Sequence, residues 1–131
     1  MGPCVVVFAG EYSVSVKSRL RSEMSRISTK PEVVLDFTEV TFIDSICVTE
    51  LLRMQKRRSA AEYPRASIVI NTPSLKRLFT VLNLDRVFNV VETLDDALPR
   101  NGETSQIEYA FSGDGGIAAP DDFVSVVAGR I

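Results

Sequence analysis

Apolar runs and amphipathic stretches alternate along most of the chain. Short runs rich in Val, Ile and Phe are typical of β-strands and occur at 4–9, 32–37, 66–70 and 87–91, with a further short extended piece at 40–43. Between them, apolar residues recur every three or four positions, as on one face of a helix, most clearly at Val16, Leu20, Met24 and Ile27. This alternation predicts an α/β fold, with helices packed on a mixed but largely parallel sheet of about four to five strands.

Two of the predicted helices begin at residues that are typical caps. Ser13 is a candidate N-cap of the first helix, and Pro31 prevents that helix from continuing. Asp44 and Ser45 open the second helix, whose inward face we expect to include Val48, Leu51, Leu52 and Gln55. We interpret the basic stretch 56–58 at its end as a solvated helix terminus, because cations there favour the negative end of the helix dipole.

The character of the chain changes near Pro99. Residues 1–98 hold the pattern of strands and helices, whereas residues 99–131 are rich in glycine and polar residues. We therefore expect one domain over 1–98 and a mobile tail over 99–131, within which the apolar segment 123–127 is a candidate terminal strand. The glycine run 113–116 lacks the flanking strand and helix that a phosphate-binding loop needs.

The composition limits the chemistry that this chain can perform. No histidine occurs among the 131 residues, which excludes Ser-His and Cys-His catalytic pairs and removes the commonest metal ligand. Cys4 and Cys47 do not form a C-x-x-C pair, so a structural zinc site has no support, and we interpret Cys47 as a buried thiol. Asp36 and Asp44 have no third ligand or nucleophile spaced to join them in metal binding or acid–base catalysis. We expect a protein that is not an enzyme and uses no cofactor.

Charge and hydropathy bear on the partners and the location. The formal net charge is −2 and the pI is about 5.2, whereas a general nucleic-acid binder normally has a strong basic excess. No apolar stretch reaches the roughly 20 residues of a membrane span, and the first residues lack the basic region of a signal peptide. We therefore expect a cytoplasmic protein with no nucleic-acid partner and no direct membrane insertion.

The block from Val33 to Ser45 carries a recognisable signature. It reads VVLDF and then VTFIDS, and the helix after it contains Leu51 and Leu52. This block is similar to the signature of the STAS family, the bacterial anti-sigma factor antagonists and their relatives. Weaker similarities to the same family follow in the expected order at 69–73, 82–88 and 94–98. The resemblance covers residues 4–98 and implies a single STAS-like domain that does not include the tail.

The resemblance implies a regulatory protein that acts by binding. In this family, a partner kinase, which is often the anti-sigma factor itself, phosphorylates the first serine after the aspartate. Unphosphorylated members bind the anti-sigma factor and free the sigma factor, and phosphorylated members let go. The corresponding serine here is Ser45. By the same resemblance, we expect the partner to contact the face that contains Asp44, Ser45, Ile46, Thr49, Ser13 and Ser15.

Two alternatives stay open at this site. A serine at a helix start often serves only as a cap, and Asp44 competes with Ser45 for that role. The family pattern also has Ser-Gly after the first serine, where this chain has Ile46 and Cys47. The change removes the backbone freedom of glycine and introduces a bulky β-branched residue. The alternative function is a STAS subunit without a phosphate switch, in a lipid-transport ABC complex or a stressosome-like scaffold.

Overall fold

The computed structural model of the protein describes residues 2–98, 105–112 and 126–128. Over these residues, six strands form one sheet in the order β4-β3-β2-β1-β5-β6. The parallel strands are β1 (Cys4–Tyr12), β2 (Val33–Ile43), β3 (Ser67–Val69), β4 (Asn89–Val91) and β5 (Ser105–Ser112). The strand β6 (Val126–Ala128) pairs with β5 in the antiparallel direction. The predicted α/β class with a mixed, largely parallel sheet is therefore confirmed.

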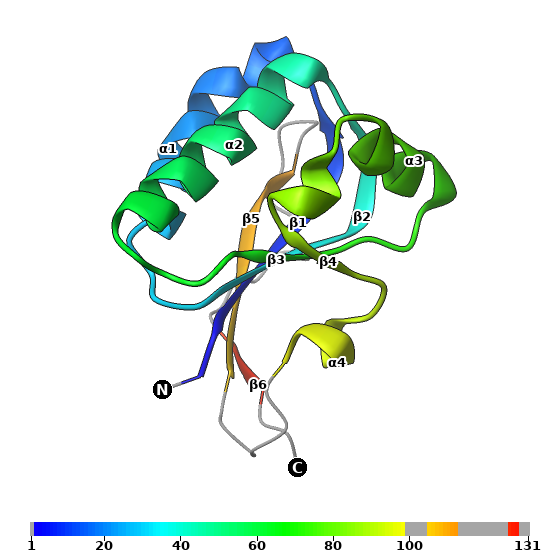
Figure 1. Cartoon of the computed structure of the whole chain (residues 1–131). Helices are drawn as coiled ribbons and strands as arrows, with labels where there is room; N and C mark the ends of the chain where they lie inside the picture. Colours follow the sequence, from blue (N-terminus) through cyan, green and yellow to red (C-terminus); the bar gives the residue numbers. More distant parts are fainter. Residues whose placement is uncertain (1, 99–104, 113–125, 129–131) are drawn as a thin grey trace.

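Helices cover the two faces of this sheet unequally (Figure 1). They are η1 (Val14–Val16), α1 (Lys17–Ile27), α2 (Ser45–Ala60), α3 (Pro73–Val81), η2 (Leu84–Arg86) and α4 (Leu94–Ala97). Val6 and Leu35 belong to the core beneath α1, α2 and α3, whereas the adjacent Val5 and Val34 pack with Leu98 after α4. Because successive strand residues point to opposite faces, the three longer helices share one face and α4 lies on the other. None of the helices in the described ranges is long and apolar enough to cross a membrane.

The strand β5 corrects the prediction of a polar tail. Residues 105–112 fall in the segment that we expected to lie outside the sheet, but they pair in parallel with β1 and make β1 an inner strand. The strand was missed because it is not a continuous apolar run: Gln106 is exposed, while Ala110 and Phe111 are buried. Of the predicted terminal strand 123–127, residues 126 and 127 belong to β6, and 123–125 lie outside the described residues.

The end of α2 also differs from its predicted role. Arg58, interpreted as part of a solvated terminus, is fully buried. Its guanidinium donates hydrogen bonds to the backbone carbonyls of Lys30, Pro31 and Pro64, with Nη2 3.0 Å from each of the last two oxygens. Burial lowers the pKa of Arg58 below its usual value. The side chain thus fixes the end of α2 to the segment that leads into β2, and the three carbonyl acceptors compensate for part of its lost hydration.

The inward face of α2 was predicted with one error. Val48, Leu51 and Gln55 are buried as expected, and the Gln55 side-chain oxygen accepts a hydrogen bond from the Ala66 amide at 3.0 Å. Leu52, however, is 37% exposed. It lies one residue beyond the buried Leu51, and a step of one residue turns the side chain about a quarter of the way around the helix.

Candidate functional site

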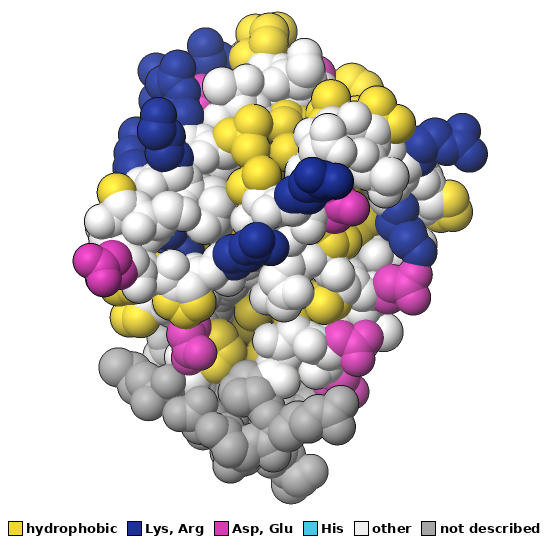
Figure 2. All heavy atoms as spheres, viewed as in Figure 1, with side chains coloured by type: hydrophobic (Ala, Val, Ile, Leu, Met, Phe, Trp, Pro, Cys, Tyr) yellow, Lys and Arg dark blue, Asp and Glu magenta, His cyan; other side chains and the backbone are white. Residues whose placement is uncertain are grey.

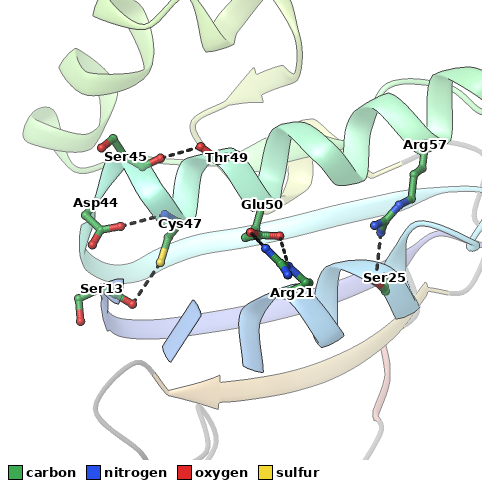
Figure 3. Close-up of polar contacts among 9 residues, drawn as sticks. All are labelled: Ser13, Arg21, Ser25, Asp44, Ser45, Cys47, Thr49, Glu50 and Arg57. Atoms are coloured by element: carbon green, nitrogen blue, oxygen red, sulfur yellow. Dashed lines mark hydrogen bonds and ion pairs between the residues drawn. The ribbon is translucent and has the colours of Figure 1, made fainter. Parts of the chain in front are cut away.

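The carboxyl ends of β1 and β2 bring the starts of η1 and α2 together at one end of the molecule (Figure 1). Two hydrogen bonds hold this junction. The Asp44 amide donates to the Tyr12 carbonyl at 3.0 Å, and the Cys47 thiol donates to the Ser13 carbonyl at 3.3 Å (Figure 3). The parallel pairing of the two strands thus positions residues that are about thirty positions apart in the sequence.

Asp44 takes the capping role at the start of α2. Its backbone is extended, and its carboxylate accepts a hydrogen bond from the Cys47 amide at 2.8 Å. Ser45 is the first residue of α2 and is exposed, and its hydroxyl makes no hydrogen bond within the described part of the chain. Asp44, which is half-buried, therefore satisfies one of the free amides of the first turn and leaves the Ser45 hydroxyl available.

The other predicted site residues lie around the same junction. Thr49 is exposed one turn after Ser45, and its hydroxyl donates to the Ser45 carbonyl at 3.1 Å (Figure 3). Ser13 is half-buried and Ser15 is exposed, with their hydroxyl oxygens 3.0 Å apart. Ser13 does not cap a helix through its side chain, because the 3-10 turn η1 precedes α1 and no capping bond forms. The structure thus brings all six predicted residues to one end of the molecule.

Exposed apolar side chains form a feature that the sequence reasoning missed. Val14 in η1 is 58% exposed, Phe42 near the end of β2 is 47% exposed, and Ile46 in the first turn of α2 is 41% exposed. Figure 2 shows hydrophobic side chains at the surface around the upper end of the molecule and over α3. The alternation at the end of β2 was the available signal, since Phe42 lies next to the buried Ile43 and must point to the other side. These three residues lie at the end of the molecule that contains Ser45, and we refer to them together as the apolar cluster.

The two cysteines of the chain are poor nucleophiles. Burial, followed by the hydrogen bond and charge of Asp44, raises the pKa of Cys47 to about 12. Burial also raises the pKa of Cys4 to about 11. Because the thiolate is the reactive form, both side chains act as small buried groups, as we predicted for Cys47. The described residues contain no group of three His, Cys, Asp or Glu side chains arranged to hold a metal ion.

A buried carboxylate ties α2 to α1. The Glu50 side chain is 2% exposed and receives two hydrogen bonds from Arg21, Nε to Oε1 at 3.2 Å and Nη2 to Oε2 at 3.1 Å. Further along, Arg57 Nη1 donates to the Ser25 hydroxyl at 3.0 Å (Figure 3). The hydrogen bonds from Arg21 lower the pKa of Glu50, and the charges of Arg53 and Lys17 act in the same direction. These links fix the middle and the end of α2 relative to α1.

Comparison with known proteins identifies the family. The family model of the STAS domain matches residues 1–97. The chain belongs to the STAS family. Among solved structures, this STAS domain is similar to the crystal structure of an anti-sigma factor antagonist from Mycobacterium paratuberculosis, with 23% sequence identity, a TM-score of 0.58, and coverage of 70% of this chain and 81% of that chain. The predicted STAS resemblance and the STAS-like fold are thus confirmed.

A second solved structure is more distant. It is the anti-sigma factor antagonist SpoIIAA in its unphosphorylated form, with 19% identity, a TM-score of 0.49, and coverage of 63% of this chain and 86% of that chain. No curated protein matches the sequence significantly.

Proposed function

We propose that this STAS protein is an anti-sigma factor antagonist that binds an anti-sigma factor with serine kinase activity and is switched off by phosphorylation of Ser45. The observation that carries the proposal is the exposed Ser45 hydroxyl on the first residue of α2, with the cap supplied by Asp44. The similarity in fold to a known anti-sigma factor antagonist supports the same role. This role belongs to the bacterial cytoplasm and requires no catalytic step by the chain itself.

The surface around Ser45 has the composition of a protein-binding site. The apolar cluster contributes one exposed side chain from each of η1, β2 and α2, and the exposed Ser15 and Thr49 supply hydroxyls beside it. Energetically important contacts at protein interfaces typically come from a few apolar or aromatic side chains that become desolvated, with polar groups at the rim. A partner that covers Ile46 would also lie over Ser45, because the two residues are neighbours in the first turn of α2.

A phosphate on Ser45 would change binding without changing the fold. It adds a charge of about −1.5 to −2 near neutral pH, and the amino end of a helix stabilises negative charge. A partner packed over Ser45 would have to desolvate this charge, at a cost of about several kcal/mol unless it supplied cations. Because a loss of about 1.4 kcal/mol weakens binding tenfold, one phosphate is sufficient to release the partner.

The direct test is phosphorylation by candidate anti-sigma kinases with ATP, read by intact-protein mass spectrometry. We expect wild type to gain one phosphate and Ser45→Ala to gain none, whereas the neighbouring variants Ser15→Ala and Thr49→Ala should each still gain one phosphate. Phosphate uptake by Ser45→Ala equal to that of wild type would overturn the assignment. In a parallel binding assay, Ser45→Asp should retain the partner less well than Ser45→Ala.

The alternative role as a non-switching STAS subunit rests on one observation. Ile46, which stands where the family has a serine, leaves 41% of its surface exposed directly beside Ser45. A permanent apolar contact would use this side chain without requiring release. That role predicts stable co-purification with an ABC ATPase or with many copies of a related protein, and equal retention by Ser45→Ala and Ser45→Asp.

A further inference from the structure

Positive charge is concentrated on the two helices next to the proposed site. The helices α1 and α2 contain eight of the fifteen Lys and Arg residues of the chain but only two of its seventeen Asp and Glu residues. Figure 2 shows Lys and Arg side chains gathered along the edge of the molecule that α1 forms. These two helices are therefore strongly positive in a chain whose formal net charge is −2.

Four of these cations follow the line where α1 and α2 meet. Arg21 and Arg57 lie directly on it, since Arg21 binds Glu50 across the two helices and Arg57 binds the Ser25 hydroxyl (Figure 3). Lys17 is one helical turn before Arg21, and Arg53 is one turn before Arg57. We call Lys17, Arg21, Arg53 and Arg57 the basic seam.

The basic seam is not neutralised within the described residues. Glu50 is the carboxylate beside it, and both of its oxygens are already bound by Arg21. Arg57 donates to a neutral hydroxyl, and Arg53 and Lys17 form no ion pair in the described part of the chain. The other carboxylate of these helices, Glu23, is paired with Arg26. A net excess of positive charge therefore faces the solvent along the seam.

We propose that the basic seam binds an acidic protein surface, namely a carboxylate-rich segment of the partner that also covers the apolar cluster. This inference rests on the proposed function and specifies the chemistry of the partner. Carboxylates can form bidentate hydrogen bonds with the exposed Arg53 and with the half-exposed Arg21. Complementary charge of this kind mainly accelerates association and selects among partners.

An acidic protein fits this surface better than a nucleic acid does. The seam begins beside the apolar cluster, because Lys17 directly follows η1, which contains Val14. An apolar area beside a cationic one suits a protein partner, whereas nucleic-acid backbones require extended positive charge. The rest of the chain is net acidic and would repel a long polyanion. A phosphate on Ser45 would lie at one end of the seam and reduce its attraction for the partner.

The test measures binding of the full chain to a fluorescein-labelled glutamate-rich peptide by fluorescence anisotropy at low salt. Matched probes are the same peptide with glutamine in place of every glutamate, and a DNA duplex. The double charge reversal Arg53→Glu with Arg57→Glu is compared with Arg77→Glu with Arg86→Glu, which reverses two exposed cations in α3 and η2. Far-UV circular dichroism checks that each variant is folded, and Arg53→Gln with Arg57→Gln is a milder second variant.

We expect wild type to bind the glutamate peptide in preference to both other probes, with affinity that falls as salt is raised. The seam reversal should weaken this binding about tenfold or more, the glutamine variant should weaken it less, and the control reversal should leave it unchanged. Equal binding by wild type and both seam variants would overturn the proposal, as would tighter binding to DNA. The assay uses no kinase, so its failure is distinguishable from a failure of Ser45 phosphorylation.

Discussion

Substitutions at the start of α2 test whether Asp44 caps the helix while the Ser45 hydroxyl stays free. The Asp44 carboxylate accepts a hydrogen bond from the Cys47 amide at 2.8 Å, and Cys47 is fully buried. The substitution Asp44→Ala removes this acceptor and leaves the amide without a partner. Loss of an N-cap costs about 0.5–2 kcal/mol, and the burial of Cys47 favours the upper half of that range, since water has little access to the amide.

The measurement is urea denaturation followed by circular dichroism, with a thermal melt as a second readout. A cost of about 1–2 kcal/mol should lower the Tm by at least about 4 °C for a domain of this size. Asp44→Asn is the matched control, because asparagine is an equally good cap and should lose much less. Ser45→Ala should change the free energy of unfolding by no more than about 0.5 kcal/mol, as for most exposed positions.

The comparison between Asp44→Ala and Ser45→Ala shows which of the two side chains stabilises the start of α2. A loss of stability in Ser45→Ala equal to that in Asp44→Ala would mean that the serine hydroxyl also supports the helix start. The hydroxyl would then not be available to a kinase without a structural cost, and the reasoning behind the proposed switch would be wrong.

Three further predictions concern the contacts that position the site. Arg21 lowers the folded-state pKa of Glu50, so the pair stabilises the fold above the unfolded-state pKa of about 4.3, and this stability is lost as the pH falls through the folded-state pKa. Urea denaturation across this pH range should therefore show that Arg21→Gln loses less of its free energy of unfolding on acidification than wild type does. The Cys47 thiol, with its pKa raised to about 12, should not react with Ellman's reagent at pH 8 until the protein is unfolded in urea, and rapid reaction of native protein would contradict its burial. Arg58→Ala should cost about 3 kcal/mol or more, because it removes a fully buried side chain together with its hydrogen bonds to three backbone carbonyls. Arg57→Ala at the neighbouring exposed position should cost below about 1 kcal/mol, and similar losses in the two variants would refute this difference.

The sequence predicts this fold well where the signal is local. Apolar runs and capping residues identify β1, β2 and the start of α2, because both depend on residues within one or two turns. The strand β5 was missed for the opposite reason. It lies in a polar, glycine-rich region, and its pairing with β1 joins segments about a hundred residues apart. Such a contact depends on the assembled sheet and leaves only a weak pattern in the strand itself.

The candidate site was also predictable only in part. The order of Asp44 and Ser45 at a helix start follows from the sequence, but two capping candidates in a row do not indicate which one forms the bond. The exposure of Val14 and Phe42 and the burial of Arg58 are tertiary properties. An apolar residue is usually buried and an arginine is usually solvated. These three residues do the opposite because of the way in which the helices and strands pack around them.

Ile46 and Cys47, which replace the Ser-Gly of the family pattern, point to opposite sides of α2. Both lie in the first turn of α2, and in the described residues a positive φ occurs only at Gly10, Glu62 and Asn83, so the backbone at Ile46 and Cys47 does not need glycine. Cys47 points inward, where its amide binds Asp44 and its thiol binds the Ser13 carbonyl. Ile46 points outward and enlarges the apolar surface beside Ser45. The departure therefore leaves the candidate serine exposed and changes the shape that a partner must match, so we expect it to alter partner choice more than the switch itself.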